Sequence, residues 1–119
     1  GQSATRLADG RVAVVGGNTP RTELYDPVAA TWTSAGPTAA TLTADGAVVL
    51  PDGRLLVAGG TQFAQPAAEL FDPATGAWAA AAAMLVIRAH PTATRLPDGS
   101  AMVCGGAPDD AGPDCETYW

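Results

Sequence analysis

Few side chains in this sequence of 119 residues could carry chemistry, and most of them lie in its last third. His90 is the only histidine. A zinc site or a Ser-His-Asp triad would have to use it, yet no His-x-x-x-His or Gly-x-Ser-x-Gly motif is present. We therefore interpret His90 as a loop residue on the rim of the fold, beside Pro91, and we predict no catalytic residue in this chain.

Three carboxylates, those of Asp109, Asp110 and Asp114, share one polar segment. Hard cations bind clusters of oxygen ligands, so a cation site is conceivable there. Acidic residues in a Gly/Pro loop are more typical of a solvated surface, and we predict neither a metal nor another cofactor.

The charge balance excludes some partners. The formal net charge is −6, with six arginines, no lysine and no basic cluster. Phosphate binding needs concentrated positive charge, so we expect no nucleic-acid partner. No apolar stretch approaches the roughly 18 residues of a membrane span, so we expect no membrane insertion. The chain begins at Gly1 without a signal-peptide pattern, which suggests a mature, trimmed or partial chain.

The elements that position these residues form an internal repeat. An Asp-Gly pair, a short apolar run, a diglycine, and a Glu two residues before an aromatic recur in that order. The Asp-Gly pairs begin at Asp9, Asp52 and Asp98, and the later positions are Gly16, Gly17, Glu23 and Tyr25; Gly59, Gly60, Glu69 and Phe71; and Gly105, Gly106, Glu116 and Tyr118. The first two units continue to Trp32 and Trp78.

The length of the repeat varies in one place. The interval from diglycine to Glu is six, nine and ten residues in the three units. Variable loops of repeat proteins lie on one face, often the binding face. We predict a binding face formed by these loops and by the connector before the third unit. Its residues are Asn18, Arg21, Gln62, Phe63, Gln65, Arg88, His90, Asp109, Asp110 and Asp114.

Each complete unit predicts four short antiparallel strands, and the third, incomplete unit predicts the first three. The Asp-Gly turn joins the first two, the Glu and the aromatic lie on the third, and an Asp-Pro pair leads to the Trp strand. The apolar runs before the diglycines are expected to be buried on both faces. Ala79 to Met84 favours helix by propensity, but its counterpart contains Gly36-Pro37, so strand and connector are predicted.

The two cysteines flank the third variable loop. The repeat register places Cys104 and Cys115 opposite each other on neighbouring strands, at a spacing close to that of a disulfide. We predict a bridge, which would indicate an oxidising compartment; two reduced buried thiols are the alternative.

This pattern resembles the kelch repeat, whose marks are a diglycine followed by a Tyr and a Trp with six residues between them. Gly16-Gly17, Tyr25 and Trp32 carry it, as do Gly59-Gly60, Phe71 and Trp78. The resemblance implies an all-β fold, a kelch-type β-propeller segment of about two and a half four-stranded blades. In such a fold the aromatic and the Trp fill the wedge between sheets. The repeated Glu is expected to bond backbone N–H groups or a neighbouring Arg.

Galactose-oxidase-like and glyoxal-oxidase-like enzymes build a copper site on such a propeller, using two Tyr and two His, with one Tyr cross-linked to a Cys of the preceding blade. That Tyr stands two residues after an Arg. Here Arg88-Ala89-His90 resembles the pattern, with His90 in the place of Tyr. The Cys partner would fall near Ala44, which has no sulfur. The resemblance therefore implies copper only if residues outside this chain bind it.

We accordingly expect a partial propeller, with blade 1 at about 1–37, blade 2 at about 38–84 and an incomplete blade 3 at about 85–119. The remaining blades would come from the same gene or from other chains. The leading hypothesis is a non-catalytic interaction module for a protein or carbohydrate partner. The alternatives are a fragment of a secreted copper-radical oxidase and an architectural repeat of a filament or cell-surface assembly. An extracellular or cell-surface location is expected, with the cytoplasm as the alternative.

Overall fold

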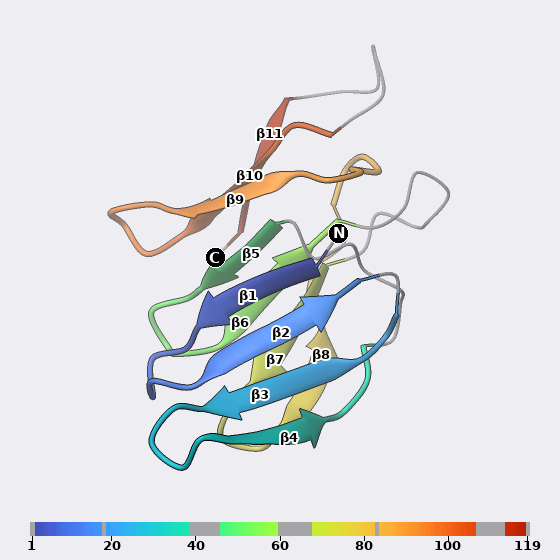
Figure 1. The fold of residues 1–119 in the computed structure, drawn as a ribbon. Helices are drawn as coiled ribbons and strands as arrows, with labels where there is room; N and C mark the ends of the chain where they lie inside the picture. The colour runs from blue at the N-terminus through green and yellow to red at the C-terminus, as the bar shows by residue number, and fades with distance from the viewer. Residues whose placement is uncertain are drawn as a thin grey trace.

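The fold is all-β and contains three antiparallel sheets (Figure 1). The structure is a computed structural model that describes residues 2–17, 19–38, 46–59, 68–82, 84–106 and 114–118. Every regular element among these residues is a strand. None of the described segments forms a helix that could span a bilayer.

Sheet 1 has the strand order β1-β2-β3-β4. Its strands are β1 (Gln2–Arg6), β2 (Val12–Gly16), β3 (Thr22–Asp26) and β4 (Thr31–Ala35). Sequential antiparallel strands joined by short turns give this meander without a crossover.

Sheet 2 repeats the same order in β5 (Gly46–Val49), β6 (Leu55–Ala58), β7 (Ala68–Asp72) and β8 (Ala77–Ala80). The alanine-rich segment that begins at Ala79 continues β8 and then leaves the sheet without helix, as predicted. Pairing with β7 therefore overrides its helix propensity.

Sheet 3 has three described strands, β9 (Thr92–Arg95), β10 (Ala101–Cys104) and β11 (Cys115–Tyr118). β10 lies in the middle, so β11 pairs on one side only within the described part of the chain. The outer edge of β11 is the position that β4 and β8 occupy in sheets 1 and 2.

The Asp-Gly turns are built alike in the three sheets. In each turn the Asp side chain accepts a hydrogen bond from the backbone N–H two residues later, at Arg11, Arg54 or Ser100. The glycine adopts a positive φ, 93° at Gly10, which favours a residue without a Cβ. Hydrogen bonds from the Arg11 side chain are the main cause that lowers the pKa of Asp9.

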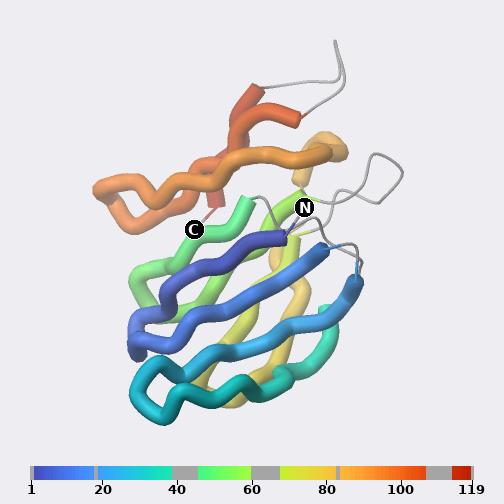
Figure 2. The backbone as a smooth tube through the Cα atoms, viewed as in Figure 1, coloured from blue at the N-terminus to red at the C-terminus, as the bar shows by residue number. Residues whose placement is uncertain are grey.

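The sheets pack through their faces, and their first strands lie next to one another. β5 lies beside both β1 and β9 (Figure 2). Between sheets 1 and 2, which we call the first interface, a core forms from Leu7, Ala13, Val15, Leu24, Leu55, Val57 and Phe71. Between sheets 2 and 3, the second interface, the core is Leu50, Leu56, Ala58, Ala68, Met84, Ala101 and Val103.

Burial on both faces was predicted for all three strands that precede a diglycine, and it holds for β6 alone. All four residues of β6 are buried, whereas burial alternates along β2 and β10. Burial differs because sheet 2 lies between the other two sheets and is covered on both faces. Among the described residues, sheets 1 and 3 are each covered on one face only.

Candidate functional site

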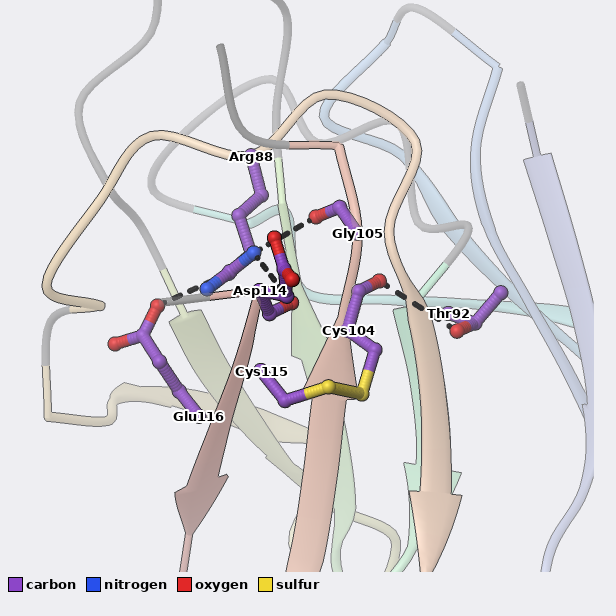
Figure 3. Close-up of a disulfide and its surroundings, with 7 residues drawn as sticks. All are labelled: Arg88, Thr92, Cys104, Gly105, Asp114, Cys115 and Glu116. Carbon is purple, nitrogen blue, oxygen red and sulfur yellow. Dashed lines mark hydrogen bonds and ion pairs between the residues drawn. A yellow bond between two sulfur atoms is a disulfide. The ribbon is translucent and has the colours of Figure 1, made fainter. Parts of the chain in front are cut away.

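The end of sheet 3 that carries the third variable loop is organised around Arg88 (Figure 3). Arg88 precedes β9, and its side chain is fully buried. Its Nε donates to Oε2 of Glu116 on β11 at 3.0 Å. Its Nη1 donates to the carbonyls of Gly105, at 2.9 Å, and Asp114, at 3.0 Å. One guanidinium thus holds both ends of the loop between β10 and β11.

A disulfide joins the same two strands, which confirms the predicted bridge. Cys104 and Cys115 are paired across β10 and β11, and their Cα atoms lie 4.1 Å apart. The N–H of Gly105 also donates to the carbonyl of Asp114 at 2.8 Å. The base of the loop is therefore fixed by a covalent bond and by three hydrogen bonds to backbone carbonyls.

The diglycines allow the connector before β9 to approach the sheets closely. A Cβ on Gly106 would lie 2.1 Å from the carbonyl oxygen of Ala89, and the N–H of Ala89 donates to the carbonyl of Gly106. A Cβ on Gly59 would lie 2.6 Å from Pro91. His90, between these contacts, adopts a φ of 53° and exposes its side chain. Gly59 and Gly106 are thus packing sites for the connector.

Of the residues predicted for the binding face, the structure describes four, and three of them are exposed to solvent. Arg21, His90 and Asp114 are exposed. Arg88 was predicted with them, but its burial removes it from any partner's reach and makes it a residue that positions the loop. Asn18, Gln62, Phe63, Gln65, Asp109 and Asp110 lie outside the described residues, as do Gly60 and Ala44.

The repeated glutamates have different surroundings. Glu116 accepts hydrogen bonds from the N–H of Leu85 and from Arg88, as predicted for this position. Glu69 is buried in sheet 2, and Glu23 is exposed in sheet 1. The repeat therefore sets the position of the Glu, and in sheet 3 the connector before β9 supplies its hydrogen-bond donors.

A cavity of about 790 Å³ lies in the second interface, and the sequence reasoning missed it. It is lined by Leu50, Leu56, Leu70, Ala80, Ala81, Ala82, Leu85, Cys115, Glu116, Thr117 and Tyr118. The Tyr118 hydroxyl is buried and has no hydrogen-bond partner among the described residues. Burial raises the pKa of Tyr118 to about 12, and the nearby Glu116 carboxylate adds to the effect. No motif in the sequence indicated this cavity, because its lining comes from segments far apart in the chain.

Comparison with known proteins gives a likeness of fold. No model of a protein family matches the chain, and no curated protein sequence matches it. Solved structures do match, among them a fungal alcohol oxidase of the AA5 family in complex with copper. The TM-score is 0.70 at 21% identity, over 87% of this chain and 24% of that one. The two share a fold, and the present chain spans about a quarter of the length of that structure.

Proposed function

We propose that this chain is a segment of a kelch-type β-propeller and that it acts as a non-catalytic interaction module. Its partner would be a protein or glycan that contacts the loop end of the sheets. The repeat, the three antiparallel sheets and the adjacency of their first strands support the propeller assignment.

The observation that carries the proposal is the double fixation of the third loop. The Cys104–Cys115 bond and the Arg88 guanidinium hold both ends of the segment that contains Asp109 and Asp110. Fixing a loop before binding reduces the conformational entropy that binding would otherwise cost. The same two constraints also stabilise the fold, and in a recognition loop they add affinity.

The charge of the loop suggests what it binds. Asp109, Asp110 and Asp114 are three of the twelve carboxylates of a chain whose net charge is −6. Complementary potentials favour a partner with positive charge, such as a basic protein surface or an amino-sugar glycan. The exposed Asp114 is the described member of this group.

The test compares two triple variants that lose equal charge at opposite ends of the sheets. Asp109→Asn/Asp110→Asn/Asp114→Asn alters the loop, and Asp9→Asn/Asp52→Asn/Asp98→Asn alters the Asp-Gly turns. Binding of the full chain to polylysine and to amino-sugar oligosaccharides is measured, with polyglutamate and neutral oligosaccharides as negative probes. We expect the loop variant to bind at least tenfold more weakly than the turn variant.

Reduction of the disulfide should also weaken binding to the cationic probes, while the circular dichroism spectrum of the sheets stays unchanged. Equal losses in the two triple variants would show that net charge alone drives binding, and the loop would then not be the site. Absence of binding to every cationic probe would also overturn the proposal.

We place the protein outside the cell, because the Cys104–Cys115 disulfide is typical of oxidising compartments. The disulfide also means that Cys104 is unavailable as a redox-active thiol.

A copper-radical oxidase is the second candidate, favoured by the likeness to the AA5 alcohol oxidase. The residues of this chain do not fit its cofactor. His90 stands where the resemblance requires the cross-linked Tyr, and both cysteines of the sequence are used in the disulfide. Any copper ligands would therefore have to come from a longer protein. Copper content and alcohol-dependent oxygen uptake of that longer protein test this candidate, and a copper-free, inactive protein would exclude it.

A further inference from the structure

We infer that His90 is the residue with which the loop end of the sheets selects its partner, and that the partner is an amino-sugar glycan. The inference rests on the proposed function and narrows its partner class. The imidazole of His90 contacts the sugar hydroxyls, and carboxylate binds the ammonium group of the sugar. His90 is thus a specificity-determining residue of the binding face.

The connector before β9 is anchored on both sides of His90. Arg88 and Pro91 are fully buried, whereas the His90 side chain between them is exposed. Pro91 packs against Gly46, the first residue of β5, and Gly59, which follows β6; a Cβ on either glycine would lie 3.2 Å and 2.6 Å, respectively, from the Pro91 ring. The backbone that carries the imidazole is therefore fixed by packing against sheet 2.

The same connector places His90 beside the base of the third variable loop. The N–H of Ala89 donates to the carbonyl of Gly106 at 2.9 Å. Nη1 of Arg88 donates to the carbonyl of Asp114 at 3.0 Å. The exposed imidazole of His90 and the exposed side chain of Asp114 therefore belong to the same end of sheet 3.

The backbone of His90 is strained. Its φ is 53°, in the left-handed region, which residues with a Cβ rarely adopt, and a residue before proline is restricted further. A glycine would adopt the same φ without this strain. Strained residues that persist in folded proteins are concentrated at binding and active sites. An exposed imidazole on a strained and anchored backbone therefore indicates recognition rather than packing.

An imidazole next to a carboxylate suits an amino sugar better than a lysine side chain. A neutral imidazole donates one hydrogen bond and accepts another, and a sugar hydroxyl also does both. A lysine ammonium only donates, so carboxylates satisfy it without the imidazole. An amino sugar carries hydroxyls and an ammonium group on one ring. His90 and Asp114 together therefore favour an amino sugar over a basic peptide.

The test substitutes glycine at the two non-glycine residues with positive φ in the described part of the chain, His90 and Ala30. Ala30 is the matched control, because it is exposed in the turn before β4, at the other end of the sheets from the variable loops. Both substitutions relieve backbone strain, so His90→Gly and Ala30→Gly should each raise the midpoint of urea denaturation of the full 119-residue chain.

Binding is measured with three probes, which are a glucosamine oligosaccharide, a lysine peptide of equal charge and a neutral glucose oligosaccharide. We expect His90→Gly to bind the glucosamine oligosaccharide about tenfold more weakly, as for the loss of one or two hydrogen bonds, and to bind the lysine peptide unchanged. Ala30→Gly should bind both cationic probes like the unsubstituted chain. The glucose oligosaccharide, which has hydroxyls but no ammonium group, should bind to none of the proteins.

Several outcomes would overturn the inference. Unchanged binding of the glucosamine oligosaccharide to His90→Gly would place the imidazole outside the site. Equal losses for both cationic probes would show that His90 acts on the loop rather than on the sugar, and a lowered denaturation midpoint would give its side chain a structural role. Binding of the lysine peptide alone would make a basic protein the partner. In all these cases the proposed function stands while either cationic probe binds, and it fails together with the inference if neither does.

Discussion

The two interfaces between sheets are built from the same repeat but are held by different forces. The first is closed by Trp78, which lies over a continuous apolar core and donates to Thr22. The second interface also has an apolar core. Beside that core it contains a cavity of about 790 Å³, whereas the first interface contains the Trp78 indole. The ion pair between the fully buried Arg88 and Glu116 lies beside that cavity, as does the disulfide.

This difference shows which part of the repeat closes an interface. The first three strands of each unit supply the central core in both places, so they suffice to bring the sheets together. In the first interface, the aromatic residue of the fourth strand, Trp78 on β8, supplies the outer part of the packing between the sheets. Where that strand is not present among the described residues, polar and covalent contacts order the outer edge of sheet 3.

The largest expected effect comes from opening the first interface. Trp78→Ala removes a partly buried indole that packs against the core, and it leaves the Thr22 hydroxyl without its donor. We expect the free energy of unfolding to fall by about 4 kcal/mol, measured by urea denaturation.

Trp32→Ala is the matched control, because Trp32 holds the same register position on sheet 1 but is 59% exposed. Its loss should cost no more than about 1 kcal/mol. Equal costs for the two variants would contradict the assignment of Trp78 as the residue that closes the first interface.

The second interface should instead depend on its ion pair. Arg88→Met keeps an apolar stem of similar length but leaves the Glu116 side chain, which is 8% exposed, without its cation. We expect a loss of about 3 kcal/mol in denaturation experiments, because removal of one partner leaves a buried charge uncompensated.

Glu23→Gln tests whether this cost is specific to the second interface. Glu23 has the same place in the repeat as Glu116 but is exposed. Its substitution should change stability by less than about 0.5 kcal/mol. A loss comparable with that of Arg88→Met would mean that the repeated Glu matters in every sheet.

Internal repetition made most of the fold predictable. The intervals between Asp-Gly, diglycine and aromatic residues set the strand order and the Cys104–Cys115 pairing, because antiparallel register follows from turn positions. The buried state of Arg88 was not predictable, since it depends on the connector folding back over sheet 3. The cavity was not predictable either, because its lining joins residues of sheet 2, the connector and β11 that only three-dimensional packing brings together.

The smallest predicted effect concerns the phenol that the second interface contains and the first does not. Phe71 stands in sheet 2 where Tyr118 stands in sheet 3, and the buried Tyr118 hydroxyl has no partner among the described residues. Tyr118→Phe should therefore be neutral or stabilising by up to about 1 kcal/mol near pH 7, measured by urea denaturation.

High pH should enlarge this difference. Folding raises the pKa of Tyr118 from 10.0 to about 12, so the folded state holds the phenol proton more tightly than the unfolded chain. The associated stability is complete below pH 10 and is lost as the pH rises towards 12. For a half-buried ring we expect about 1 kcal/mol of this loss, which Tyr118→Phe should not show. If the difference between the two proteins stays constant from pH 9 to about 11.5, the phenol is hydrated in solution and the cavity is wetter than its apolar lining implies.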